Sequence, residues 1–199
     1  MRNEEEQLRP TRRAQIVQAA TRVLTRAGLH GLTMQAIAQE AGVPKSVVLY
    51  HVRDRQGLLL LLAEHVAQLR LQLDAPLETQ GGDPRQHLGH WLTGLFEAIQ
   101  APDSPLRLLW AVRLDAEGQT LEPLRTPLEK REIWQLSTLL QRGHSQACWH
   151  APDATRLAQA LKALTDGFLL QALLVAHDAQ ACRKLLASCR GAVMDLLVR

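Results

Sequence analysis

Residues 33–52 read TMQAIAQEAGVPKSVVLYHV and form two short apolar-patterned segments on either side of Gly42. The spacing of the apolar residues matches the contact positions of two crossing helices, with Ile37 in the first segment and Val48 and Val52 in the second. Glycine between such segments favours a tight turn, because it adopts backbone conformations that other residues avoid. The spacing therefore predicts two short helices that cross steeply, as in a helix-turn-helix unit.

Two interpretations of this unit stay open on spacing alone. In a DNA-binding helix-turn-helix, the second helix enters the major groove with its N-terminal residues foremost. In this chain those residues are Lys45, Ser46 and Val47. Short helix pairs with a glycine turn are also common in helical proteins that never bind nucleic acid, so the flanking sequence has to decide.

The flanking sequence predicts one more helix on each side. Residues 8–27 place apolar side chains at three-four spacing with arginines opposite, which indicates an amphipathic helix ending at Gly28. Asp54 is a natural cap for a fourth helix over residues 55–73. Residues 58–63 are apolar on nearly every side of that helix, which is tolerated only where other elements pack from several directions. We therefore expect the fourth helix to connect two parts of the molecule.

The rest of the chain predicts a helical second domain after a short linker. Proline and glycine in residues 75–84 mark the linker. Further helices are expected over residues 85–100, 105–116, 122–146, 152–177 and 179–198. No strand pattern appears, so the predicted fold is all-α, with an N-terminal three-helix helix-turn-helix domain joined by a long helix to a C-terminal helical domain. We place these domains at residues 1–55 and 56–199.

Composition favours an intracellular protein that folds without disulfide bonds. The 199 residues are 46% apolar, which is enough for a core. The three cysteines cannot all pair with one another, which favours a reducing compartment. The N-terminus has no apolar signal segment, and no run of 18 apolar residues exists to cross a membrane. We therefore expect a cytoplasmic protein without a membrane partner.

Positive charge is concentrated in the first quarter of the chain. Residues 1–55 contain nine Lys or Arg against five Asp or Glu, whereas residues 56–199 contain fourteen against fifteen. Such a surplus is compatible with a polyanionic partner, although charge runs are usually solvated faces.

Catalytic and metal-binding motifs are missing. The sequence has no phosphate-binding glycine loop, zinc-protease helix or nucleophile elbow, so we expect neither an enzyme nor a cofactor. His144, Cys148 and His150 come nearest to a metal site, but a fourth ligand is missing and no metal is expected.

The segments AGLHGLTM, IAQEAGVPKSVVLYHV and RDRQGLL, in this order, resemble the DNA-binding domain of the TetR family of one-component transcriptional regulators. The resemblance extends over residues 12–62. It implies DNA contacts at the start of the second helix, along the third and at the start of the fourth, by Thr33, Gln35, Lys45, Ser46, Val47, Tyr50, His51 and Arg55. Lys and Arg would neutralise phosphates, and Tyr and His would hydrogen-bond to phosphates or base edges.

Two of these contacts have a complication. The family commonly has a tyrosine at position 49, where this chain has Leu49, so the hydroxyl of Tyr50 is displaced by about 100° around the helix. His51 has an alternative role as a polar partner between helices.

The resemblance also implies that the C-terminal domain encloses a small-molecule effector. Candidate lining residues are the aromatic side chains of this domain and one arginine, namely Trp91, Trp110, Arg113, Trp134 and Phe168. Aromatic residues fill helical cores as well, so core packing is the alternative for each tryptophan and for the phenylalanine.

The last two expected helices carry more apolar surface than a lone domain needs. The stripes consist of Leu157, Leu161, Leu164 and Phe168 on one helix and Leu186, Cys189, Val193 and Leu197 on the other. The resemblance implies that two such helices from each subunit form a four-helix homodimer interface. A buried helix pair within one chain is the alternative.

These observations predict a homodimeric, effector-responsive transcriptional regulator that binds a pseudo-palindromic operator in double-stranded DNA. The resemblance implies a repressor more often than an activator. The alternatives are a ligand-independent helical DNA-binding protein, and a small-molecule-binding helical protein or enzyme without a DNA function.

Overall fold

The computed structural model describes residues 11–101, 106, 110, 122–175 and 177–198, and these residues are helical with no strand among them. The helices are α2 (Arg12–Gly31), α3 (Met34–Ala41), α4 (Lys45–Val52), α5 (Arg55–Glu78), α6 (Pro84–Gln100), α8 (Glu122–Ser145), α9 (Ala154–Leu174) and α10 (Ala179–Val198). The all-α fold class is thereby confirmed. The expected helix over residues 105–116 falls mostly outside the described part of the chain.

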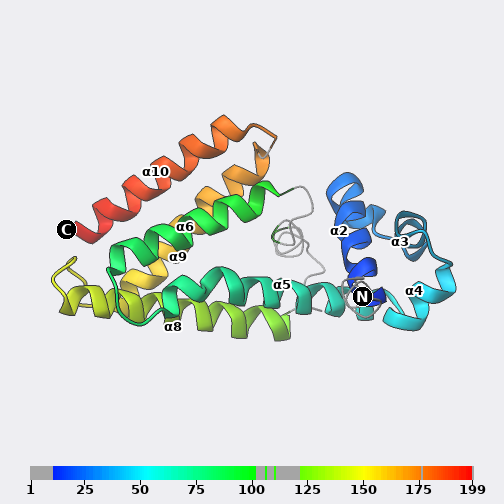
Figure 1. Cartoon of the computed structure of the whole chain (residues 1–199), viewed down its shortest axis with the longest axis horizontal. Coiled ribbons are helices and arrows are strands. Elements are labelled where there is room, and N and C mark those ends of the chain that lie inside the picture. The colour runs from blue at the N-terminus through cyan, green and yellow to red at the C-terminus, as the bar shows by residue number, and fades with distance from the viewer. Residues whose placement is uncertain (1–10, 102–105, 107–109, 111–121, 176, 199) are drawn as a thin grey trace, which may run out of the picture.

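A small core holds α2, α3, α4 and the first half of α5 together. Ile16 and Val23 of α2, Ile37 of α3 and Val48 of α4 are buried against one another in it. Val66 of α5 is part of the same core, so the long helix packs against the N-terminal helices over its first three turns. Figure 1 shows α2, α3 and α4 at one end of the molecule and α5 running from them along the other helices.

A larger core lies among α5, α6, α8, α9 and α10. Trp91, Leu95 and Phe96 of α6 are at its centre, and Leu136 and Leu140 of α8 pack on them. In Figure 1, α5 and α8 lie side by side along the lower edge while α10 lies above α6. Because α5 contributes to both cores, any shift of this helix acts on both groups of helices.

The predicted turn at Gly42 and the predicted cap at Asp54 are confirmed, and Thr33 caps a further helix. Thr33 has an extended backbone, and its side chain accepts a hydrogen bond from the Ala36 amide. Gly42 ends α3 in the left-handed conformation with φ 64°, which glycine adopts at little cost. Asp54 accepts a hydrogen bond from the Gly57 amide at 2.8 Å and begins α5. Short-range chemistry therefore fixes the turn between α3 and α4 and the start of the connecting helix.

Two helix ends differ from the sequence-based expectation. Helical structure continues beyond Gly28 to Gly31, with a kink at Gly28 where φ is 66°. The long helix α5 continues through Pro76 to Glu78 rather than ending near Leu73. Proline removes the hydrogen bond of its own amide and its ring crowds the carbonyl group one turn earlier, and α5 accordingly ends only two residues after Pro76. None of the described helices is both long and apolar enough to span a membrane.

Candidate DNA-binding surface and second-domain site

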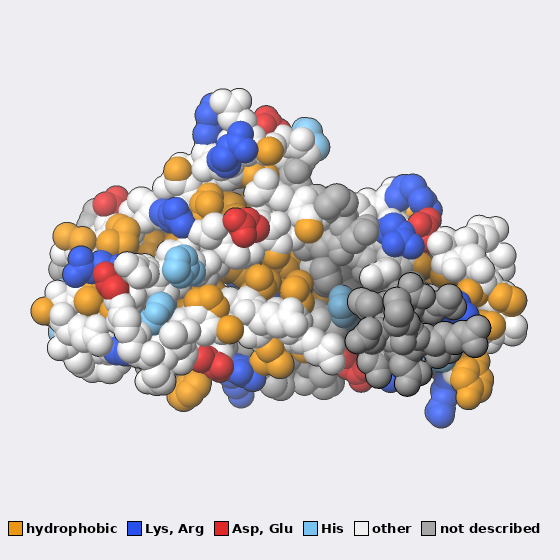
Figure 2. Space-filling view, in the orientation of Figure 1, with side chains coloured by type: hydrophobic (Ala, Val, Ile, Leu, Met, Phe, Trp, Pro, Cys, Tyr) orange, Lys and Arg blue, Asp and Glu red, His pale blue; other side chains and the backbone are white. Residues whose placement is uncertain are grey.

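The outer face of α4 carries the residues with which a helix-turn-helix would approach DNA. Lys45 and Ser46 are exposed at its N-terminus, and Val47 and His51 are half-buried. Tyr50 is 84% exposed, and its ring lies edge-on to the His51 ring at a centroid distance of 5.2 Å. Figure 2 shows basic and apolar side chains protruding at the end of the molecule that carries α3 and α4. Val48 and Val52 face the core, as predicted.

The helix that precedes α4 and packs against it, α3, is exposed at its N-terminus, at Thr33 and Gln35. Thr33 caps one amide, and the remaining first-turn amides of a helix attract anions because they have no partner within the helix. The arrangement suits a phosphate group, with Gln35 two residues after the cap.

Arg55 braces the start of α5 against the preceding helices. Its Nη1 atom donates to the Leu32 carbonyl oxygen at 3.1 Å, although the residue as a whole stays exposed. The expected role of Arg55 was a phosphate contact. The structure adds a positioning role, because this hydrogen bond joins the α2–α3 connection to the helix that leads into the second domain.

Arg53 is a surface cation that the sequence reasoning missed. It is exposed directly after α4, with φ 61°, and its backbone amide donates to the Leu49 carbonyl oxygen at 2.7 Å. The signal was present in the RDR run that follows α4, where two arginines flank the capping Asp54. Arg53 therefore adds positive charge at the C-terminal end of α4.

A surface ion-pair cluster joins α2 to α3. Glu40 accepts from Arg22 at 2.7 Å and from Arg26 at 3.1 Å. Hydrogen bonds from these two guanidinium groups lower the pKa of Glu40 below its ordinary value of 4.5. Both arginines are thus engaged within the N-terminal helices, so they hold α3 against α2.

The second domain contains a buried network of charged side chains that sequence reasoning also missed. Arg70 of α5 lies 3.0 Å from Asp74 and 2.7 Å from Glu132 of α8. Lys162 of α9 lies 3.5 Å from Glu132 and also contacts Asp166. The network therefore links α5, α8 and α9 inside the domain.

Asp74 has a further partner in this network. The Trp91 indole Nε1 atom donates to Asp74 at 2.9 Å. Burial raises the pKa of Asp74, against the opposing effects of Arg70 and Trp91. Trp91 of α6 therefore both packs in the apolar core and donates a hydrogen bond within it.

The expected effector residues lie in different surroundings. Trp91, Trp110 and Phe168 belong to the larger core or pack against it, with Trp91 fully buried. Trp134 is 63% exposed and lines a surface cleft of about 760 Å³ between α8 and the start of α9. Arg113 lies outside the described residues. The structure thus brings Trp91, Trp110 and Phe168 into one core and places Trp134 elsewhere.

The expected interface residues also divide into two groups. Leu161, Cys189, Val193 and Leu197 are covered by the helices of their own chain, with at most 1% exposed. Leu157, Leu164, Phe168 and Leu186 are half-buried, so part of each side chain remains accessible. Periodicity identified the apolar helices, but one part of each stripe packs inside the chain and only the other can meet a second copy.

No group of three or more His, Cys, Asp or Glu side chains is arranged to hold a metal ion within the part of the chain that the structure describes. His144 is instead engaged locally, because its Nδ1 atom accepts from the Ala151 amide at 3.3 Å.

Comparison with known proteins gives a consistent result. Residues 16–62 match the family described as bacterial regulatory proteins, tetR family. The HTH-type transcriptional regulator BetI of Paraburkholderia phytofirmans is 30% identical over 168 residues, which covers 84% of each chain. The protein of the same name from Burkholderia cenocepacia is 30% identical over 189 residues, covering 89% of this chain and 91% of the relative.

Solved structures show the same fold at lower identity. A TetR transcription regulator from Haloarcula marismortui superposes with a TM-score of 0.75 at 22% identity, covering 93% of this chain and 95% of the other. The fatty acid degradation regulator FadR from Bacillus halodurans superposes with a TM-score of 0.76 at 18% identity, covering 95% and 96%.

Proposed function

The chain belongs to the TetR family of DNA-binding transcriptional regulators, and we propose that it is a cytoplasmic repressor that a small-molecule effector releases from a pseudo-palindromic operator. Regulators of this family are transcription factors rather than enzymes. The proposal rests on the exposed outer face of α4. The inner face of this helix packs into the helix-turn-helix core of the chain.

The proposed DNA contacts follow from exposure and chemistry. Lys45 neutralises a phosphate and Ser46 hydrogen-bonds to the backbone or a base edge. Val47 is positioned to meet a thymine methyl group, and Tyr50 with His51 donates to phosphate or base atoms. At the edge of the site, Thr33 and Gln35 bind phosphate at the N-terminus of α3. Arg55 contributes charge there while it holds α5 in place.

The proposed active form is a homodimer. Two copies of α4 would enter successive major grooves on one side of the DNA, about 34–36 Å apart or a multiple of this distance. Residues 1–55 form the DNA-binding domain of each subunit, and residues 56–199 form the effector-binding and dimerisation domain. The accessible parts of Leu157, Leu164, Phe168 and Leu186 contribute to the subunit contact.

The proposed effector response passes through α5. This helix begins next to the DNA-binding face, at the hydrogen bond from Arg55 to Leu32, and carries Arg70 and Asp74 of the buried charge network. An effector bound among α5, α6, α8 and α9, near Trp91, Trp110 and Phe168, would shift α5 and change the distance between the two copies of α4. Couplings of this kind are typically about 1–3 kcal/mol.

Selection of bound fragments from the genome of the source cell tests the DNA function. We expect enrichment of sites with two-fold sequence symmetry, each binding two chains. Effectors identified by their binding to the protein are then titrated against the protein–DNA complex and are expected to weaken it by roughly 5- to 150-fold. If no site is enriched, the proposed DNA function is wrong. A site whose affinity responds to none of the bound ligands would indicate a ligand-independent regulator.

A further inference from the structure

The outward face of α9 lacks charge from Leu157 to the end of the helix. Between Leu157 and Leu174 the exposed residues are Gln159, Ala160, Ala163, Gly167, Gln171 and Leu174. A helix face that stays in water normally carries charged side chains. Leu174 is nevertheless 75% exposed. This face therefore has the composition of a covered surface rather than of a solvated one.

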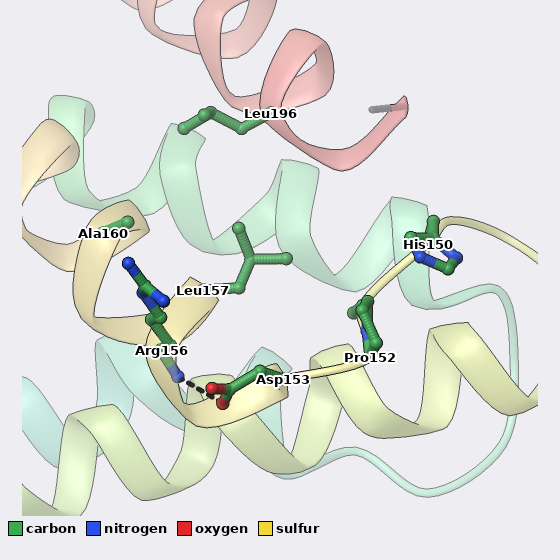
Figure 3. Close-up of a pocket in the computed structure, with 8 residues that line it drawn as sticks. His150, Pro152, Asp153, Arg156, Leu157, Ala160 and Leu196 are labelled. Atoms are coloured by element: carbon green, nitrogen blue, oxygen red, sulfur yellow. Dashed lines mark hydrogen bonds between the residues drawn. The ribbon is translucent and has the colours of Figure 1, made fainter.

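One end of the same face contains an apolar pocket. The pocket has a volume of about 300 Å³ and lies where α9 begins beside the end of α10. Figure 3 shows Leu157 and Ala160 of α9 at its floor, Leu196 of α10 on the opposite side and Pro152 at its edge. Its lining includes one histidine, one aspartate and one arginine, but most of its accessible surface is apolar, so it suits an aliphatic side chain.

The pocket and the exposed leucine are related by the geometry of one helix. Ala160 and Leu174 lie seven residues before and after Gly167, or about 10.5 Å along the axis in each direction. At 100° per residue, Ala160 and Leu174 each lie within about 20° of Gly167 around the helix, on opposite sides of it. Two antiparallel copies of α9 that touch at Gly167 would therefore bring Leu174 of each copy to Ala160 of the other.

Gly167 suits such a contact point. A Cβ atom added to it would have no neighbour within 4 Å, so nothing in its own chain occupies the space above it. Without a side chain, two helices can approach to the short end of the usual 8–10 Å interaxial range. A shallow crossing keeps residues seven positions away within side-chain reach.

The same register brings opposite charges together. Arg156 is exposed at the rim of the pocket, eleven residues before Gly167. Asp178 is exposed eleven residues after it, just beyond the end of α9. Its Oδ1 atom accepts from the amides of Gln180 and Ala181, which fixes the carboxylate at the start of α10. An antiparallel pair therefore places each arginine near an aspartate of the other copy, at both edges of the apolar contact.

We propose that Leu174 of each subunit fills the pocket of the partner subunit, in an antiparallel pair of α9 helices that cross at Gly167. This inference rests on the proposed homodimer and specifies its register. The occupant of the pocket is a second copy of this chain, because the leucine, the glycine and the charge pair all lie on one self-complementary face, as a two-fold interface requires.

Disulfide trapping in the full-length protein tests the register. Chains with Ala160→Cys mixed with chains carrying Leu174→Cys are expected to form a disulfide-linked dimer on mild oxidation. Gly167→Cys alone is expected to link to itself, because it lies on the two-fold axis. The matched control replaces Ala160→Cys by Gln159→Cys, whose side chain lies about 100° further around α9. The wild-type chain controls for its own three cysteines.

Substitutions that leave the fold intact give a second readout. Ala160 is exposed, so Ala160→Phe fills the pocket without disturbing the chain's own core. It is expected to raise the dimer Kd by about 100-fold or more, because the contact occurs twice, and a tenfold loss corresponds to only about 1.4 kcal/mol. Gln159→Phe, on the adjacent residue, is expected to change the Kd by less than about threefold.

The outcomes separate the register from the dimer itself. A wild-type protein that sediments as a monomer at micromolar concentration, with and without DNA, overturns the homodimer. A wild-type dimer in which residues 160 and 174 do not link, and in which Ala160→Phe has no effect, overturns only the register. Linkage of the Gln159→Cys pair as fast as the Ala160→Cys pair also overturns it.

Discussion

The Arg70 guanidinium of α5 lies 2.7 Å from the Glu132 carboxylate of α8, and both side chains are buried. Arg70 also lies 3.0 Å from Asp74, one turn later on α5. A buried cation held by two carboxylates thereby joins α5 to α8, through residues 70 and 132, which are 62 positions apart in the sequence. This relationship ties the helix next to the DNA-binding face to the body of the second domain.

The first prediction concerns the energetics of this network. Arg70→Met should lower the free energy of unfolding by about 3–5 kcal/mol, because it leaves Asp74 buried without its cation and leaves Glu132 with Lys162 alone. Chemical denaturation measures the change. The loss should become smaller as the pH falls from 7 to 5, since the carboxylates can then take up protons in the folded variant. Arg13→Met is the control, because Arg13 and Glu64 form an exposed pair at 3.5 Å, and a loss as large as that of Arg70→Met would contradict the argument.

This network also shows what could not be predicted from the sequence. The cap at Asp54 and the turn at Gly42 depend on residues within a few positions, and their prediction is confirmed. Contacts between Arg70, Glu132 and Lys162 depend on how three distant helices are placed, which no local pattern encodes.

Apolar stripes show a similar limit. Periodicity shows that Leu161 and Val193 turn away from water, but it does not say whether the covering surface belongs to the same chain. In this structure it does, which leaves Leu157, Leu164 and their neighbours for a partner. Trp134 shows the converse case, because an aromatic residue expected in a cavity lies on the outside of α8.

The second prediction concerns Lys45. Lys45→Ala should weaken operator binding and reduce the slope of log K against log salt concentration by about two per dimer, because each of the two subunits releases one counterion fewer from the DNA. Fluorescence anisotropy over a range of salt concentrations measures this slope for the wild type and for each variant. The control is Lys184→Ala, which removes the same charge from an exposed site on α10 and should leave the slope unchanged. An unchanged slope for Lys45→Ala would remove this residue from the phosphate contacts.

The third prediction separates the ring of Tyr50 from its hydroxyl group. Tyr50→Phe should weaken operator binding by roughly tenfold if the hydroxyl donates to DNA, because one such hydrogen bond is worth about 0.5–1.5 kcal/mol. Its thermal midpoint should equal that of the wild type, because the side chain is 84% exposed. Equal affinities of Tyr50→Phe and the wild type would assign any contact to the ring alone.

The fourth prediction is an acid dependence that comes from Glu40. Arg22 and Arg26 lower its pKa in the folded protein, so the stabilisation is complete above the unfolded value near 4.5 and is lost as the pH falls through the folded value. Glu40→Gln should therefore be less stable than the wild type at pH 6, and the difference should shrink below pH 4.5. Denaturation at several pH values tests this. Glu64→Gln, at a more exposed ion pair, should stay close to the wild type throughout, and a gap for Glu40→Gln that is constant with pH would exclude the ion pairs as its cause.

The fifth prediction uses two helical glycines whose surroundings differ. A Cβ atom at Gly143 of α8 would lie 2.1 Å from the Trp149 ring, whose Nε1 atom donates to the Leu140 carbonyl oxygen at 2.8 Å. Trp149 is therefore held flat against Gly143 and cannot withdraw without losing that hydrogen bond. Gly143→Ala should lower the free energy of unfolding by about 1–3 kcal/mol, as overpacking of a core does.

Gly89 of α6 supplies the matched control, because a Cβ atom there would meet nothing within 4 Å. Gly89→Ala should raise the free energy of unfolding by about 0.5–1 kcal/mol, since alanine favours the helix more than glycine does. Urea denaturation of both variants distinguishes packing from helix propensity by the sign of the change. A gain in stability for Gly143→Ala would mean that Trp149 can move away from α8, and the close packing of the loop after α8 would then not be required for the fold.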